Sequence, residues 1–257
     1  MSTIGLSLII PAYNEQEVIQ IALQEAHAAL TRLGWDFEII VVDDGCTDLT
    51  VQRVRQMMVD LSGIRLLSLP FNQGYGAALR TGFLQASKQF VAFTDADCQF
   101  YIEDLELLMN RTHLADIVVG NRADRQDPWL RKFYSRNYNR LVRTLLRTQV
   151  KDCDCALKVF HSNSLRQILP ATDGFFINAE MLSKAHQQQM KIEQVDVRHR
   201  PRAAGVSKVS LIEIPKIMLR IAKYWYQSRR KPVPVAENVS YLAIGGEIAI
   251  EDAYGMA

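Results

Sequence analysis

The chain has 257 residues, of which 48% are apolar and 23% are charged, with 13 glycines and 8 prolines. This composition is that of a globular protein and excludes the collagen-like, disordered and disulfide-scaffold classes. The net charge of +2 is unevenly distributed: residues 1–120 hold 7 basic and 15 acidic residues, residues 121–232 hold 23 and 9, and the last 25 residues hold four acids and no base. Such asymmetry indicates an anionic partner.

The cysteines and the apolar runs limit the compartment and the membrane topology. The four cysteines form no C-x-x-C pair, and none has a histidine at zinc-ligand spacing, so we expect no structural metal and a reduced, intracellular chain. The N-terminus lacks the basic region of a signal peptide. No apolar stretch approaches the roughly 18–20 residues that span a bilayer. We therefore expect a protein that is soluble or lies on a membrane without crossing it.

Strand-like and helix-like segments alternate over the first 120 residues. This order predicts an α/β fold with a mostly parallel sheet and helices on both faces, in which ligands bind beyond the carboxyl ends of the strands. The apolar runs typical of buried strands are Leu6–Ile10, Phe37–Val42, Ile64–Leu69, Phe90–Thr94 and Asp116–Gly120, and the helical segments between them are Glu15–Leu33, Thr47–Leu61 and Gln73–Lys88.

Acidic residues follow two of these strands. Asp43 and Asp44 come after the second, and Asp95 and Asp97 come after the fourth, with Gln99 two residues further on. Acids gathered at one sheet edge repel each other unless a cation lies there, and hard oxygen ligands favour Mg²⁺ or Mn²⁺. We therefore predict a metal site at Asp95, Asp97 and Gln99. Taken alone, the D-x-D could be a surface turn, and Asp43-Asp44 could be a turn with a helix cap.

Eight segments stand in a distinctive order: IIPAYNE (9–15), VVDDGCTDLT (41–50), NQGYGAALRTGF (72–83), FTDADCQF (93–100), GNR (120–122), DCDCALKVF (152–160), GFFINAEML (174–182) and HRPRAAGVSKV (199–209). In this order they resemble the family-2 glycosyltransferases of the GT-A fold. Within that family they look like the polyprenyl-phosphate sugar synthases, of the dolichyl-phosphate mannose synthase kind. The resemblance runs from about residue 4 to residue 228.

The resemblance implies roles for individual residues. The metal ligands would be Asp95, Asp97 and Gln99, and Asp95, Asp97, Arg202 and Lys208 would be the catalytic residues, with Arg202, Ser207 and Lys208 closing over the diphosphate. The acceptor phosphate would bind Arg122, Arg131 and Ser135. The nucleotide sugar would contact Pro11, Tyr13, Glu15, Asp43, Asp44, Asp95 and Ser207.

The sequence departs from the family pattern at four positions. Cys46 stands where Ser is usual, Cys98 where a small or apolar residue is common, and Ala156 where glycine is usual. Asn178 replaces a frequent Asp, which puts in doubt both the sugar specificity and a general-base role at that position.

Two basic segments of the second half suit an anionic partner. Residues 128–148 read as a helix with an arginine stripe at Arg136, Arg140, Arg143 and Arg147, which is either a solvated face or a membrane contact. Residues 210–227 read as a basic amphipathic helix, which either lies at a membrane interface or packs on the sheet domain or a partner subunit. No nucleic-acid recognition motif is present.

These observations predict three regions and one activity. Residues 1–209 form the catalytic domain, with a nucleotide and metal half (1–120) and an acceptor half (121–209). Residues 210–231 form the basic helix, and residues 232–257 form a tail of no recognised role. By resemblance, the activity is inverting, metal-dependent transfer of a hexose from a GDP-mannose or UDP-glucose type of donor to a polyprenyl phosphate. It would take place at the cytoplasmic face of a membrane, with peripheral attachment or a membrane-anchored partner. The alternatives are transfer to a sugar or protein hydroxyl, and a non-catalytic nucleotide-sugar-binding scaffold.

Overall fold

The computed structural model describes residues 4–122, 129–202, 221, 224, 226, 242–244 and 247–249, with the backbone alone for 130–134 and the last two ranges. The strands form one sheet in the order β7-β5-β6-β4-β1-β2-β3-β9-β8. Their bounds are β1 Gly5–Ala12, β2 Asp36–Asp43, β3 Ile64–Ser68, β4 Phe90–Phe93, β5 Ile117–Arg122, β6 Lys158–His161, β7 Ile192–Val197, β8 Leu242–Ile244 and β9 Glu247–Ala249.

The sheet is mostly parallel, as the alternation of segments predicts. The central pairs β4–β1, β1–β2 and β2–β3 are parallel, and so is β5–β7. Strand β6 runs antiparallel between β4 and β5, and β8 runs antiparallel to β9. The second half of the chain therefore extends the same sheet.

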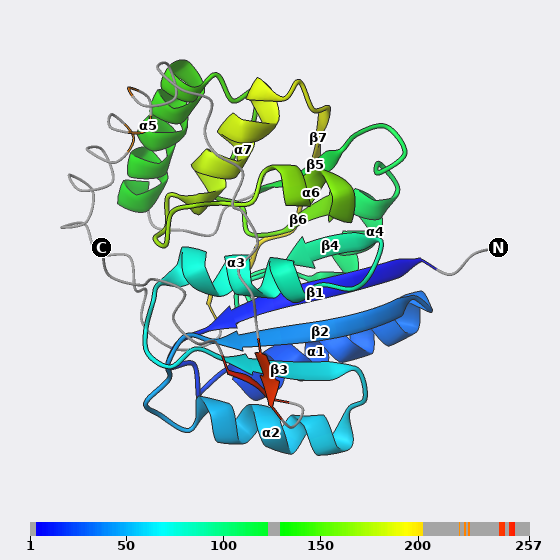
Figure 1. Ribbon diagram of the computed structural model, residues 1–257. Coiled ribbons are helices and arrows are strands. Elements are labelled where there is room, and N and C mark those ends of the chain that lie inside the picture. The colour runs from blue at the N-terminus through cyan, green and yellow to red at the C-terminus, as the bar shows by residue number, and fades with distance from the viewer. Residues whose placement is uncertain are drawn as a thin grey trace.

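Helices cover both faces of the sheet (Figure 1). Helices α1 and α2 pack against each other on one face, and α3 crosses the other face against β1 and β2. Helices α5 and α7 lie together near the β5 end of the sheet. The bounds are α1 Ile19–Leu33, α2 Thr50–Asp60, α3 Tyr75–Gln85, the 3₁₀ turn η1 Ile102–Asp104, α4 Leu105–Met109, α5 Trp129–Leu146, α6 Ser162–Gln167 and α7 Ile177–Gln187.

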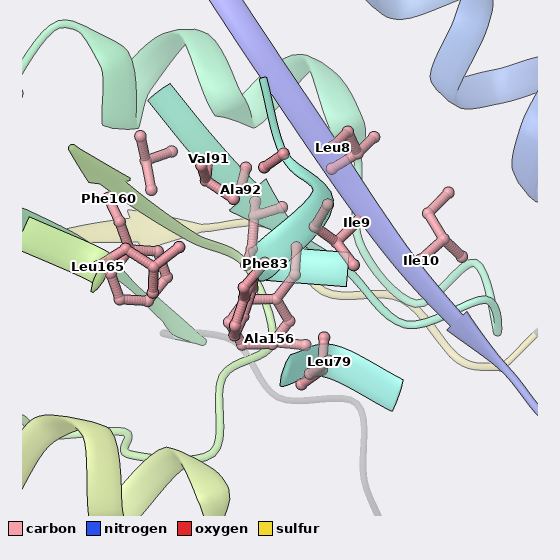
Figure 2. Packing of buried hydrophobic residues seen from close by; sticks show 14 of the residues in the cluster. Leu8, Ile9, Ile10, Leu79, Phe83, Val91, Ala92, Ala156, Phe160 and Leu165 are labelled. Atoms are coloured by element: carbon pink, nitrogen blue, oxygen red, sulfur yellow. The ribbon is translucent and has the colours of Figure 1, made fainter. Parts of the chain in front are cut away.

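The core fills both faces of the sheet, and one part of it lies between α3 and the sheet. Leu79 and Phe83 of α3 point toward Ile9 of β1 and Phe160 of β6 (Figure 2). The helix comes close because Gly82 has no side chain: a Cβ there would lie 2.3 Å from Cγ2 of Ile9. Burial of such apolar surface stabilises the fold by roughly 25 cal/mol per Å². This packing fixes the start of α3 against the carboxyl edge of the sheet.

The predicted elements are present with shifted ends. Helix α1 begins at Ile19 rather than Glu15, because residues 15–18 form a turn in which the carbonyl of Glu15 accepts the N–H groups of Val18 and Ile19. Strand β5 continues to Arg122, beyond the predicted Gly120, because it stays paired with β7 as far as Val197.

The predicted helix at 210–231 lies mostly outside the described residues. Within it Ile221, Tyr224 and Tyr226 are helical, and Ile221 and Tyr224 are buried. The Tyr224 ring meets Phe176 edge-on at 5.3 Å, so this part of the segment packs on the sheet domain. The tail at 232–257 contributes β8 and β9, and β9 lies beside β3. Among the described helices, none is both long and apolar enough to cross a bilayer.

Candidate functional site

The candidate site lies at the carboxyl edge of the central strands. The register places Ala12 of β1 opposite Asp43 of β2, and Ile9 of β1 opposite Phe93 of β4. The segments that follow these strands, residues 13–15, 44–48 and 94–99, therefore emerge at the same edge. This confirms the expectation that their polar residues gather there.

Asp43 and Asp44 both hold loops at this edge. Oδ1 of Asp43 accepts the backbone N–H of Cys46 at 2.7 Å. The carboxylate of Asp44 accepts the N–H groups of Gln73 at 2.7 Å and Gly74 at 3.0 Å, and burial raises its pKa. These contacts fix the loop before α3, and the predicted contact of both residues with a nucleotide stays a prediction.

The residues after β1 and β2 are joined to each other. Sγ of Cys46 accepts the N–H of Asn14 at 3.2 Å, and burial raises the pKa of this thiol to about 12. The hydroxyl of Thr50 accepts the N–H of Glu15 at 2.8 Å. At this position a neutral thiol thus accepts a backbone hydrogen bond from the loop after β1. Tyr13 and Glu15 lie half-buried in the same loop, and Pro11 is buried at the end of β1.

Asp95 and Asp97 lie close enough for each charge to act on the other. Tyr75 donates its hydroxyl to Oδ1 of Asp95 at 2.8 Å, and Gln99 donates its N–H to Oδ1 of Asp97 at 3.1 Å. Burial and the charge of Asp95 raise the pKa of Asp97 to about 6. Burial also raises the pKa of Asp95, against the opposing effect of the cations Arg122, Arg202 and Lys158.

Arg202 reaches this pair of acids from the segment after β7. A bridge between Phe100 and His199, and the N–H of Arg200 bonded to the carbonyl of Gln99 at 3.0 Å, hold the two segments together. Nη2 of Arg202 lies 2.8 Å from Oδ2 of Asp97. Arg202 is thus placed against the candidate metal ligands, whereas Ser207 and Lys208 lie outside the described residues.

The acid pair fits a divalent cation that also binds phosphate. Within the described residues no three His, Cys, Asp or Glu side chains gather as a metal site. The amide of Gln99 donates to the carbonyl of Arg200 at 3.5 Å. Mg²⁺ in phosphate-transfer sites commonly takes one or two carboxylates and fills its other positions with substrate oxygens and water. Two mutually repelling carboxylates, one half-buried and one buried, match that donor set, and Gln99 remains a predicted third ligand.

The predicted acceptor residues lie at the ends of β5 and within α5. Arg122 makes two bonds to Asp152, at 2.6 and 2.8 Å, and both side chains are nearly buried. Burial opposes the charge of Arg122, but the bonds to Asp152 outweigh it and raise its pKa. On α5, Asn139 donates to the hydroxyl of Ser135 at 3.3 Å and accepts the N–H of Cys153 at 2.8 Å. The side chain of Arg131 lies outside the described residues.

A buried lysine lies against Asn178. Lys158 lies on β6 and is 1% exposed, and burial lowers its pKa. Its ammonium donates to Oδ1 of Asn178 at 3.0 Å, to the carbonyl of Cys153 at 3.0 Å and to the carbonyl of Cys155. Asn178 is itself buried, and its side-chain oxygen is an acceptor for this ammonium inside the core.

Sequence reasoning missed three of these groups. Asp152 and Lys158 lie inside the segment DCDCALKVF, where a charged residue in an apolar run was the available signal. Tyr75 lies in the glycine-containing loop before α3, and nothing in its sequence position indicates Asp95 as its partner.

Comparisons with known proteins fit this geometry. The family model described as glycosyl transferase family 2 matches residues 7–169. Two curated relatives, the undecaprenyl-phosphate 4-deoxy-4-formamido-L-arabinose transferases of Edwardsiella ictaluri (strain 93-146) and Pectobacterium carotovorum subsp. carotovorum (strain PC1), are each 30% identical over 217 and 218 residues. These matches cover 83% of this chain and 65% of each relative, so the chain spans slightly less than two thirds of their length.

Solved structures share the fold. Glucosyl-3-phosphoglycerate synthase from Mycobacterium tuberculosis, in complex with Mn²⁺, UDP and glucosyl-3-phosphoglycerate, superposes with a TM-score of 0.69 at 18% identity. The match covers 93% of this chain and 84% of that chain. The same enzyme with Mg²⁺ and UDP gives a TM-score of 0.67 at 18% identity, over 93% and 84%. With the GT-A-like sheet, the acids at its carboxyl edge and the matching family model, the chain belongs to glycosyl transferase family 2.

Proposed function

We propose that this protein transfers a sugar from a nucleotide-diphosphate donor to a polyprenyl phosphate. One observation carries the proposal: the carboxylate pair of Asp95, which is half-buried, and Asp97, which is buried, stands beside cations from three separate segments, and Arg122, Lys158 and Arg202 all act on Asp95. Such a site can bring together a metal-bound diphosphate and a second phosphate. The names of the curated relatives support the polyprenyl-phosphate class.

In this proposal, separate groups of residues bind the metal, the diphosphate and the acceptor phosphate. Asp95 and Asp97 hold the divalent cation, Mg²⁺ or Mn²⁺, which when bound stabilises the charge on the leaving nucleotide. Arg202 adds positive charge next to Asp97, at 2.8 Å in the ligand-free geometry. Arg122, held rigid by Asp152, receives the acceptor phosphate together with Arg131 and Ser135. Ser207 and Lys208 complete the closure over the diphosphate.

A phosphate acceptor needs no protein base. Its second pKa is near 6, so it is largely ionised at neutral pH and requires orientation rather than deprotonation. A hydroxyl acceptor would need a positioned carboxylate. Asn178 supplies none, because its side chain is a carboxamide, and its Oδ1 accepts a hydrogen bond from Lys158. This favours the phosphate acceptor over a sugar or protein hydroxyl.

The acceptor lipid implies work at a membrane. Arg136, Arg140 and Arg143 are exposed along α5, Arg147 is exposed just after its end, and Trp129 at its start is 77% exposed. Arginine attracts anionic lipid headgroups, and an exposed tryptophan suits the interfacial region. We place the protein peripherally at the cytoplasmic face, where nucleotide sugars are available.

The test is transfer of radiolabelled sugar to an extractable lipid. GDP-mannose, UDP-glucose and a nucleotide-activated 4-deoxy-4-formamido-L-arabinose are each incubated with Mn²⁺ and undecaprenyl or dolichyl phosphate. The proposal expects a mild-acid-labile product from one of these donors, lost in Asp97→Asn. Asp36→Asn is the matched control, because Asp36 lies at the opposite end of β2 in an exposed pair with Lys88. Label on a soluble sugar or protein would favour the hydroxyl acceptor, and donor binding without any transfer would favour the scaffold.

A further inference from the structure

Tyr75 occupies a tightly constrained place at the start of α3. Asp44 fixes the preceding loop, and Gly74 adopts a φ of 101°. The N–H of Gly76 donates to the carbonyl of Asp173 at 2.7 Å. A Cβ at residue 76 would lie 2.3 Å from the carbonyl oxygen of Thr172. The backbone on both sides of Tyr75 is therefore pressed against residues 172 and 173.

The contacting segment is held firmly from two helices. Arg80 of α3 pairs with Asp173 at 2.7 Å. From α7, the carboxylate of Glu180 accepts the N–H groups of Ala171 at 2.7 Å and Thr172 at 3.0 Å. Residues 170–173 thus form a rigid support for the first turn of α3.

The side chain of Tyr75 is fixed at both its ring and its hydroxyl. The ring stacks on Phe175, with centroids 5.4 Å apart and planes inclined by 24°. The hydroxyl donates to Oδ1 of Asp95 at 2.8 Å. A phenol is protonated at neutral pH, so the hydroxyl is the donor in this bond.

We propose that Tyr75 is a positioning residue that binds Oδ1 of Asp95 and thereby presents Oδ2 of that carboxylate to the divalent cation. The inference rests on the proposed function, because it takes Asp95 as a metal ligand. Groups that orient a ligand carboxylate commonly change metal affinity 10- to 100-fold when they are removed. Phe175 contributes by restricting the tyrosine ring.

Tyr75→Phe separates this role from a structural one. The variant keeps the ring and its stack on Phe175 and removes one hydroxyl. We expect the dissociation constant of Mn²⁺ to rise about tenfold, with little change in the thermal unfolding midpoint of the metal-free protein. Mn²⁺ binding is measured by electron paramagnetic resonance on the full chain, in the presence of UDP or of GDP.

Three companion variants make the result decisive. Tyr101→Phe is the matched control: the Tyr101 ring lies under Arg198, at 4.4 Å, and the variant should bind Mn²⁺ as the wild type does. Phe175→Leu should weaken Mn²⁺ binding less than Tyr75→Phe, and it provides a second test should Tyr75→Phe fail to fold. Asp97→Asn should abolish binding.

Two outcomes overturn the inference and are distinguishable. Wild-type affinity in Tyr75→Phe, with binding lost in Asp97→Asn, contradicts the role of Tyr75 and leaves the metal site standing. Equal Mn²⁺ binding by the wild type and Asp97→Asn removes the metal site itself, and the positioning role with it.

Discussion

At the scale of single residues, the candidate site depends on two carboxylates, Asp95 and Asp97. Desolvation disfavours the ionised form of both, and the charge of Asp95 further disfavours that of Asp97. Asp97 is 3% exposed and lies beside Asp95. Burial and the neighbouring charge raise its pKa to about 6, so in the folded protein Asp97 keeps its proton to a higher pH than a free aspartate does. A cation binding here would relieve the cost of ionising the two carboxylates, which couples metal binding to stability.

The variant Asp97→Asn tests how much the ionisation of Asp97 destabilises the fold, through the pH dependence of the free energy of unfolding. Between the ordinary aspartate pKa of about 3.9 and about 6, the folded chain keeps a proton that the unfolded chain has released, so stability falls as pH rises through this window. Asn does not titrate. The stability of Asp97→Asn relative to the wild type should therefore rise from pH 4 to pH 7 by about 2–3 kcal/mol. Urea denaturation in the presence of a chelator measures this difference, and parallel pH profiles for the two proteins would contradict it.

Arg202→Ala should move metal binding and catalysis in opposite directions. The guanidinium lies 2.8 Å from Oδ2 of Asp97 and competes there with a divalent cation. Without nucleotide, Mn²⁺ affinity should rise about fivefold, equivalent to about 1 kcal/mol. Sugar transfer should fall, because charge next to the leaving diphosphate is lost.

Mn²⁺ titration measures the first effect and kcat/KM measures the second. The variant Arg202→Lys should lie nearer the wild type in both. A loss of Mn²⁺ affinity would show that Arg202 supports the cation instead.

The sequence predicts which segments meet at the site better than it predicts their contacts. Asp43 ends β2, and Asp95 and Asp97 follow β4, so strand order and register bring them to one edge. The bonds Tyr75–Asp95 and Lys158–Asn178 join segments 20 residues apart through packing of α3 and α7 on the sheet. Periodicity carries no information on such pairs, since each depends on side chains from two elements.

At the scale of elements, α7 acts as the anchor of the loop that supports α3. Glu180 and Lys184 lie one turn apart on α7, 1% and 4% exposed at the side chain, and their charged groups are 2.9 Å apart. Both also hold the loop: Lys184 donates to the carbonyl of Leu169 at 2.5 Å, and Glu180 accepts the hydroxyl of Thr172 at 2.6 Å. This buried ion pair also forms hydrogen bonds with backbone groups of residues 169–172, so it holds that loop in one position.

Glu180→Gln should destabilise the protein by about 3 kcal/mol at pH 7, because it leaves a buried ammonium without its counter-charge. Burial would raise the pKa of Glu180, but Lys184 and Thr172 outweigh it and the pKa is lowered. The stabilisation is therefore present at neutral pH and is lost as pH falls through the folded pKa, so the deficit of the variant should shrink in acid. Chemical denaturation at pH 7 and pH 4 measures both values.

The double variant Glu180→Gln/Lys184→Met is the control. Removing both charges should recover part of the stability lost in the single variant. A double variant as unstable as the sum of its singles would mean that the loop contacts, rather than the charges, carry the effect.

The elements differ in how well their sequences predict them. Strands β1 and β2 are continuous apolar runs, and their bounds are close to the prediction. Strands β6 and β7 were not predicted: β6 has four residues and begins with a buried lysine, and β7 alternates with charged residues. Both segments are strands because they pair with β5. This pairing depends on the arrangement of the sheet and not on the local sequence.

At the scale of the whole molecule, the near-neutral net charge is the sum of two unlike halves. The acidic half supplies Asp43, Asp44, Asp95 and Asp97 at the sheet edge. The basic half supplies Arg122 and Lys158 beside them, and the exposed arginines of α5 outside. Arg122 and Lys158 are held in the interior by their own partners, whereas the exposed stripe is available to a surface. The two sets can therefore be separated by mutation.

Replacing Arg136, Arg140 and Arg143 together by Gln should release the protein from anionic membranes. Each basic residue near such a surface contributes about 1 kcal/mol, so three should lower the partition coefficient onto phosphatidylglycerol vesicles about 100-fold at low salt. Because Arg122 and the acid pair are untouched, transfer to a short, detergent-solubilised polyprenyl phosphate should stay near the wild-type rate.

The matched control replaces three other exposed cations by Gln: Arg111, Arg166 and Lys191. They lie near the ends of α4 and α6 and at the start of β7, and the change in net charge is the same. Vesicle co-sedimentation across a salt series separates the cases, since the contribution of the stripe is screened as salt rises. Equal release by both triple variants would mean that overall charge, rather than the α5 stripe, draws the protein to the membrane.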